Sequence, residues 1–324
     1  SAAHGRMPQL AGATITAGAD VAQVSRLTTA VSDALTTRLV QLALEELGPP
    51  PAAFAFMALG SAGRKEQTLY SDQDNAIIYE NAAPGTQEYF LSLGAKVCAG
   101  LDAAGYPFCN GRVMAREPKW CRPLTEFKEM FSRWTVELGD QDLRDVNICF
   151  DFRAAAGDSH LAAELRRHVL DAVRDKPRFL FHLADTTLQF KPPVGFFGNI
   201  QVESSGAHAE AFSIKTAVVP IINFARIYAL HHGIAATNTL ERLRLLRGLD
   251  VLTQTGHDEL AQSYVELMRL RLRHQAARLA EGLPPDNHIN PKRLTELERM
   301  MLKRIFSHIA ALQARLTTDF ARTA

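Results

Sequence analysis

Two spacings of apolar residues divide this chain into predicted helices and strands. Steps of three and four residues run from residue 20 to residue 47 and indicate one long amphipathic helix. A continuous apolar run over residues 53–59 and a second run ending at Tyr79 are typical of buried strands. In chain order, the spacing predicts helices over residues 20–47, 86–104, 124–137, 159–174, 177–189, 215–232, 239–249, 258–281 and 294–318, and strands over residues 53–59, 72–79 and 146–152.

All the predicted strands precede residue 157, and the remainder of the chain has helical spacing almost throughout. This order indicates the α+β class, with a mixed β-sheet and flanking helices followed by an all-α helical bundle. We therefore predict a sheet domain over residues 20–157 and a helical domain over residues 158–324. Residues 1–19 are rich in Ala, Gly and Thr and are interpreted as a linker or a cloning remnant.

Composition narrows the classes of protein. The formal net charge of the 324 residues is +1, which argues against a large nucleic-acid surface. The chain has no apolar run of about 18 residues, so we expect no membrane span. It also has no secretory signal pattern, so we expect no export. Four cysteines without a close pair favour reduced thiols in a cytoplasmic protein over a disulfide framework or a structural zinc site.

The strongest chemical pattern lies between residues 54 and 79. Side chains two apart on a strand point to the same face, so Asp72 and Asp74 are expected together, with Gln73 on the opposite face. Two neighbouring carboxylates repel each other unless a cation lies between them, and Mg²⁺ prefers such oxygen ligands. Gly60 and Ser61 provide a tight turn before a short helix, where backbone N–H groups favour phosphate.

A third acid, Asp151, is the only one within the predicted strand 146–152. If that strand pairs near Asp74, a third carboxylate joins the first two. Asp151 could equally cap the following turn or pair with Arg153, and both alternatives stay open at this point.

These residues resemble a known signature. Gly60-Ser61, an interval of ten residues and Asp72-x-Asp74 resemble the DNA polymerase beta nucleotidyltransferase superfamily. The longer string resembles bacterial signal-transduction nucleotidyltransferases, which often follow CBS or cyclic-nucleotide-binding domains and are similar to the catalytic part of PII-protein uridylyltransferase. The matching segments are 60–67, 71–75, 109–115, 118–120, 150–153, 225–230 and 239–243.

The resemblance implies an enzyme that moves a nucleoside monophosphate from a nucleoside triphosphate, ATP or UTP, to an acceptor hydroxyl. It implies that Asp72 and Asp74 hold two Mg²⁺ ions, one steadying the departing pyrophosphate and one activating the hydroxyl. Asp151 would complete the second metal site or act as the general base.

Six residues are candidates for holding the triphosphate. Preorganised backbone donors and cations are the groups that stabilise charge in phosphoryl transfer. The simpler alternative for the charged members is a solvated helix surface. The candidates are Gly60, Ser61, Gly63, Arg64, Lys65 and Lys215.

The resemblance leaves the acceptor open between a regulatory protein, in a signal-transduction role, and a small molecule. A nucleotide-binding regulatory module without catalysis is the third alternative, from a different functional class. The family also implies an upstream regulatory domain, which we expect to be missing from this chain. The identity of the base and the oligomeric state are not predicted.

Overall fold

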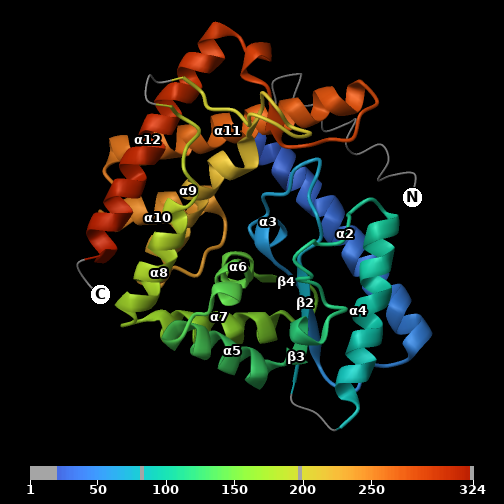
Figure 1. Ribbon diagram of the computed structural model, residues 1–324. Helices are drawn as coiled ribbons and strands as arrows, with labels where there is room; N and C mark the ends of the chain where they lie inside the picture. The colour runs from blue at the N-terminus through green and yellow to red at the C-terminus, as the bar shows by residue number, and fades with distance from the viewer. Residues whose placement is uncertain (1–19, 81–83, 196–198, 322–324) are drawn as a thin grey trace. The chain divides into compact units, whose positions relative to one another are not determined.

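The computed structural model describes residues 20–80, 84–195 and 199–321 (Figure 1), so the linker predicted over residues 1–19 lies outside the described residues. The described chain divides into two compact units, the first of Ala22–Lys176 and the second from Pro177 onward. The sequence predicts this boundary after residue 157. In the structure the helix Ser159–Val173 belongs to the first unit, because this helix packs against the sheet.

A four-stranded mixed sheet forms the centre of the first unit. Its order is β3-β2-β1-β4, in which β1 is antiparallel to both of its neighbours and β2 is parallel to β3. Every residue of β1 and β2 is buried, which explains why both read as continuous apolar runs. The strands are β1 Phe54–Ala58, β2 Asn75–Tyr79, β3 Cys121–Pro123 and β4 Arg153–Gly157.

Helices cover both faces of this sheet (Figure 1). Helices α5 and α7 pack on one face, and α2 and α4 lie on the other, where Asp33 of α2 pairs with Arg153 of β4. The helical elements are α2 Val21–Leu47, α3 Gly60–Gly63, α4 Thr86–Ala103, η1 Pro118–Trp120, α5 Leu124–Val136, α6 Asp140–Cys149 and α7 Ser159–Val173.

One predicted strand is wrong. Residues 146–152 alternate in hydrophobicity, but most of them belong to α6 and the turn that follows it. Val146, Cys149 and Phe150 are buried, and their spacing of three and four residues is that of a helix face. The fourth strand is β4, whose run of three alanines has little strand propensity and gives no alternating pattern.

The second unit is helical, apart from one short strand pair. Helix α9 lies at its centre and packs against α8, α10, α11 and α12. Gly256, expected to separate two helices, lies inside the first turn of α11, because Thr253 accepts a hydrogen bond from its N–H and begins the helix earlier. The elements are α8 Pro177–Leu188, β5 Phe212–Ser213, α9 Ile214–His231, α10 Thr239–Gly248, α11 Gln254–Ala280, β6 His288–Ile289, η2 Pro291–Arg293 and α12 Glu296–Ala321.

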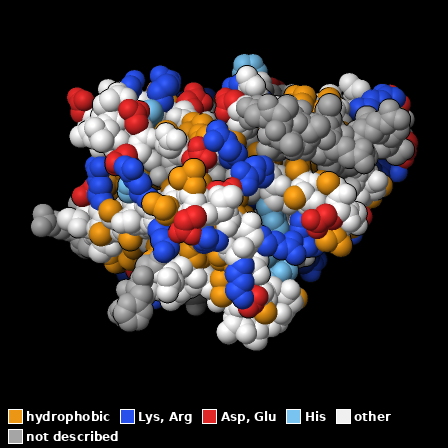
Figure 2. All heavy atoms as spheres, turned by 90° about the horizontal axis from the view of Figure 1, so that it is seen from above, with side chains coloured by type: hydrophobic (Ala, Val, Ile, Leu, Met, Phe, Trp, Pro, Cys, Tyr) orange, Lys and Arg blue, Asp and Glu red, His pale blue; other side chains and the backbone are white. Residues whose placement is uncertain are grey.

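Surface charge agrees with the near-neutral composition. On the face drawn in Figure 2, Lys and Arg side chains are interspersed with Asp and Glu. Among the described residues, none of the helices is long and apolar enough to cross a membrane.

Candidate active site

The two central strands bring the glycine turn and the acidic pair together. Gly60 lies just after β1, with only Leu59 between them, and Asp72 and Asp74 lie in the segment that leads into β2. The Leu59 N–H donates to the Asp74 carbonyl at 3.0 Å, which extends the β1–β2 ladder to the site. The sheet thus determines where the acidic pair lies relative to the turn.

Gly60 has two reasons to lack a side chain. Its φ is +54°, which L-residues with a Cβ adopt only at a cost. A Cβ built at this position would lie 2.8 Å from Asp74 Oδ2 and 3.5 Å from Ile148 Cγ2. The space beside the Asp74 carboxylate is therefore one that any other residue would fill.

The side chains of Asp72 and Asp74 converge with Cys109. One ligand atom from each of the three residues lies within 4.8 Å of the others. Burial, together with the negative charge of Asp74 and a hydrogen bond to it, raises the pKa of the Cys109 thiol to about 12. Cys109 is therefore a neutral S–H donor to Asp74 and leaves the two carboxylates as the charged ligands.

Gln73 and Asn75 anchor the same segment from the opposite face, as the alternation predicts. Gln73 Nε2 donates to the carbonyls of Cys98 and Tyr106, each at 3.0 Å. Asn75 Oδ1 accepts from the Ala115 N–H at 2.8 Å, and its Nδ2 donates to Gln73 Oε1 at 3.2 Å. Both amides are buried, so the backbone that carries the acids is held rigidly.

A cavity of about 30 Å³ adjoins Asp74 on the side of α2. Gln67, Gln73 and Asn75 contribute to its lining. Gln67 Oε1 is buried and has no hydrogen-bond partner among the described residues. The volume and the polar lining suit an ordered water.

Asp151 does not join the acidic cluster in the described part of the chain. Its side chain is fully buried, and its Oδ2 accepts from Arg64 Nη1 at 2.9 Å. Arg64 Nε also donates to Glu66 Oε2 at 2.7 Å. Asp151 is close to the site through its backbone instead of its side chain. A Cβ on Gly63 would lie 1.9 Å from the Asp151 carbonyl oxygen, so the backbone of Asp151 packs directly on α3.

The phosphate candidates lie in different surroundings. Ser61 is half-buried in α3, and Lys65 is exposed with a φ of +58°. Arg64 is buried between two carboxylates, so its charge is already engaged within the protein. Lys215 belongs to the second unit, where it is exposed near the start of α9. The roles of all four residues stay predictions.

Sequence reasoning missed two side chains near the acidic pair. Cys109 follows Phe108, and Phe108 forms a parallel bridge with Gln73, so the register places the thiol beside the acids. Asp145 is buried in α6, pairs with Lys119, and lies near enough to the fully buried Cys149 to contribute to raising its pKa. A helical interpretation of residues 140–149 would have grouped Asp145 with the buried Val146 and Cys149, whereas the predicted strand begins at residue 146 and leaves Asp145 out.

The donor set fits a divalent metal ion. Two carboxylates from one extended segment are the oxygen ligands that Mg²⁺ takes, and the missing side chain of Gly60 leaves room beside one of them. The residues that could hold the ion are Asp72 and Asp74.

Two family models match this chain. Residues 5–141 match the family model described as Putative nucleotidyltransferase DUF294, and residues 177–320 match the model described as Putative nucleotidyltransferase substrate binding domain. A search of the curated proteins finds no match. The two models together cover most of both units, and the chain belongs to this nucleotidyltransferase family.

Proposed function

We propose that this nucleotidyltransferase transfers a nucleoside monophosphate from ATP or UTP to a hydroxyl group of a regulatory protein, as PII-protein uridylyltransferase does. The observation that carries the reaction is the convergence of Asp72 and Asp74 beside the side-chain-free Gly60. The donor set supports dependence on a divalent metal ion.

In this proposal Asp72 and Asp74 hold Mg²⁺, which when bound supplies charge neutralisation and lowers the pKa of the acceptor hydroxyl. Gln73 and Asn75 keep the two carboxylates in place from the buried face. Cys109 remains protonated and orients the Asp74 carboxylate through its S–H donor. These residues act by holding the ligands still, since a small misplacement weakens catalysis strongly.

The turn and α3 are proposed to hold the phosphates. Ser61 and the backbone of Gly63 offer hydrogen-bond donors, and the exposed Lys65 offers a positive charge. Arg64 is proposed to act by holding Asp151 in place, because the backbone of Asp151 packs on α3. Lys215 stays a candidate for triphosphate contact from the second unit.

The description of the second family model as a substrate-binding domain supports assigning acceptor recognition to the second unit. The proposed role in signal transduction and the protein acceptor rest on the resemblance of the motif.

Labelled nucleotides test the reaction. The purified chain is incubated with Mg²⁺, a bacterial lysate and each α-³²P-labelled triphosphate in turn, beside Asp74→Asn and the control Asp102→Asn. Asp102 is an exposed carboxylate on α4 in the same unit. We expect label on a protein band with wild type and the control, and a loss of at least about 100-fold with Asp74→Asn, because loss of a metal ligand exceeds second-shell effects of 10- to 100-fold.

The acceptor is identified by where the label appears. Label on a small molecule would replace the protein acceptor, and nucleotide binding without transfer would support a regulatory module. Transfer by Asp74→Asn at the rate of the control would overturn the assignment of the acidic pair.

A further inference from the structure

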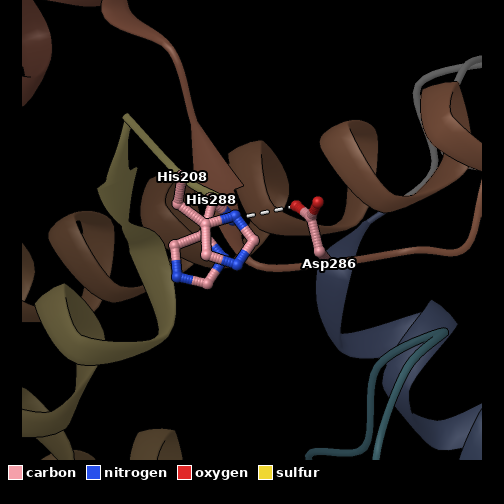
Figure 3. Close-up of side chains that lie close together, drawn as sticks. All are labelled: His208, Asp286 and His288. Carbon is pink, nitrogen blue, oxygen red and sulfur yellow. Dashed lines mark hydrogen bonds between the residues drawn. The ribbon is translucent and has the colours of Figure 1, made fainter. Parts of the chain in front are cut away.

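A second group of metal-ligating side chains lies in the helical unit. One ligand atom each from His208, Asp286 and His288 lies within 4.8 Å of the others. Figure 3 shows the two imidazole rings face to face, with Asp286 beside them. The chemistry of nucleotidyl transfer does not use these residues.

The short strand pair places two of the three ligands. Asp286 and His288 are two residues apart at the start of β6, whose His288 pairs with Ser213 of β5. Asn287, between them, points the other way, and its Oδ1 accepts from Arg271 at 2.7 Å and from Gln275 at 3.0 Å. Because Gln275 is fully buried and Arg271 nearly so, this amide anchors the segment to α11.

The loop before β5 supplies the third ligand. Backbone hydrogen bonds hold this loop: the Ala211 N–H donates to the His208 carbonyl at 3.0 Å, and the Glu210 N–H donates to the Glu203 carbonyl at 2.8 Å. The rings of His208 and His288 stack at 3.5 Å with an angle of 7° between their planes. The cluster thus joins two segments that are 80 residues apart (288 − 208).

The charge states of His288 and Asp286 are those of metal ligands. Burial, with the charge of His208 as the next contribution, lowers the pKa of His288 and keeps its imidazole neutral. Burial opposes ionisation of Asp286, but hydrogen bonds from His274 and from the His288 backbone outweigh it and lower the pKa of the carboxyl. Metal ions bind neutral imidazole and ionised carboxylate.

Two atoms of the cluster are the candidates for binding an ion, His288 Nδ1 and Asp286 Oδ2. His288 Nδ1 is buried and makes no hydrogen bond within the described ranges. Asp286 Oδ1 accepts from His274 at 2.6 Å and from the His288 N–H at 2.9 Å, and Oδ2 forms an ion pair with Arg278 at 3.3 Å. His274 therefore has the position of an outer group that orients a ligating carboxylate.

We infer that His208, Asp286 and His288 form a binding site for a divalent transition-metal ion of the zinc class. Two imidazoles and one carboxylate are a donor set that such ions prefer over Mg²⁺. The group lines a cavity of about 570 Å³, so further coordination positions face open space. An ion that binds both imidazoles must lie in both ring planes at about 2.0–2.1 Å from each nitrogen, so the stacked rings tilt apart on binding.

The basic groups around this cavity do not exclude a cation, because carboxylates already pair with two of them. Arg273 pairs with Glu298 at 2.5 Å, and Arg278 with Asp286. Arg293 also lines the cavity and is exposed. An ion held by the three ligands would share the cavity with Arg293, whose positive charge suits an anionic co-ligand.

Calorimetric titration with Zn²⁺ tests the site in the full chain. The chain is first stripped with a chelator, and Asp72→Asn/Asp74→Asn serves as the background, so that the acidic pair of the first unit does not contribute. We expect one Zn²⁺ per chain in this background, and visible absorption bands when Co²⁺ replaces it. His208→Gln and His288→Ala should each weaken binding by at least about 10-fold, the lower limit for loss of a supporting group at a metal site.

The matched control is His257→Ala. His257 lies in the same unit and contacts Asp258 at 2.8 Å, so it tests whether a histidine beside a carboxylate suffices. His208 lies in a partly exposed loop, so His208→Gln keeps the inference testable even if His288→Ala does not fold. Absence of Zn²⁺ binding in the background, or equal affinity in His208→Gln and His257→Ala, would overturn the site and leave the stacked rings as a packing contact. Neither result depends on nucleotidyl transfer.

Discussion

The buried pair of Arg64 and Asp151 separates a structural role from a catalytic one. Asp151 is fully buried, and Arg64 lies between Asp151 and Glu66 at 2.9 Å and 2.7 Å. Removing one partner of a buried ion pair costs about 3–5 kcal/mol, because it leaves a charge without compensation. In Asp151→Asn, Glu66 still neutralises Arg64, so we expect a loss of about 3 kcal/mol in the free energy of unfolding, the lower end of that range.

Arg64→Met should cost more, about 5 kcal/mol, because it leaves two buried carboxylates close together. The double variant Arg64→Met/Asp151→Asn should cost less than the sum of the two, with an interaction of about 1–3 kcal/mol. Urea unfolding followed by tryptophan fluorescence measures these values in the relevant unit, since both tryptophans, Trp120 and Trp134, are buried there.

The same variants test the alternative role of Asp151. A positioning role predicts that folded Asp151→Asn retains far more transfer activity than Asp74→Asn does. The reasoning is refuted if Asp151→Asn unfolds within about 0.5 kcal/mol of wild type, as surface substitutions do, and yet loses transfer as completely as Asp74→Asn.

Two further predictions concern the turn and the thiol beside the acidic pair. Gly60→Ala should lose about 1–2 kcal/mol of stability because of its left-handed backbone, and it should also impair transfer because the new side chain displaces Asp74. Gly48 also has a left-handed backbone, with a φ of +82°, but open space surrounds its Cβ position, so Gly48→Ala should show the stability loss alone. Urea unfolding measures the stability of both variants, and the labelled-nucleotide assay measures their transfer activity. If both variants keep full transfer, the space beside Asp74 has no role. The pKa of Cys109 is raised from 9.0 to about 12, so between these values the folded protein holds a proton that the unfolded chain releases. The contribution of Cys109 to stability is therefore complete below pH 9 and falls as the pH rises from 9 towards 12. Urea midpoints measured from pH 8 to 10.5 should fall more steeply for wild type than for Cys109→Ser, and parallel curves would contradict the burial argument.

The sequence was sufficient to predict the structure where one local rule controlled it. The alternation predicted Asp72 and Asp74 on one face, where their ligand atoms lie within 4.8 Å of each other, and Gln73 on the opposite face, where its side chain donates to the Cys98 carbonyl. The apolar runs of β1 and β2 were recognisable because both strands are buried on both faces. Most helices end within a few residues of the predicted limits, since glycine and proline end the apolar pattern.

The sequence was insufficient where tertiary contacts selected the structure. β4 has three alanines, and it is a strand only because it pairs with β1, including a register shift between Phe56 and Met57. The position of Cys109 depends on a single bridge between Gln73 and Phe108, which has no signal in composition or period. Asp151 looked like a third metal ligand because its partner, Arg64, is 87 residues earlier in the chain.

Packing connects Asp151 to the acidic pair through helix α3. Helix α3 has a glycine at each end: Gly60 faces the Asp74 carboxylate, and Gly63 faces the Asp151 carbonyl. A side chain at either position would force the short helix away from its neighbour. The buried charge of Asp151, held by Arg64, fixes the backbone on which α3 rests, while β1 and β2 fix the acids on its other side. The distance between the glycine turn and the acidic pair therefore depends on a residue whose own carboxylate is buried in the core.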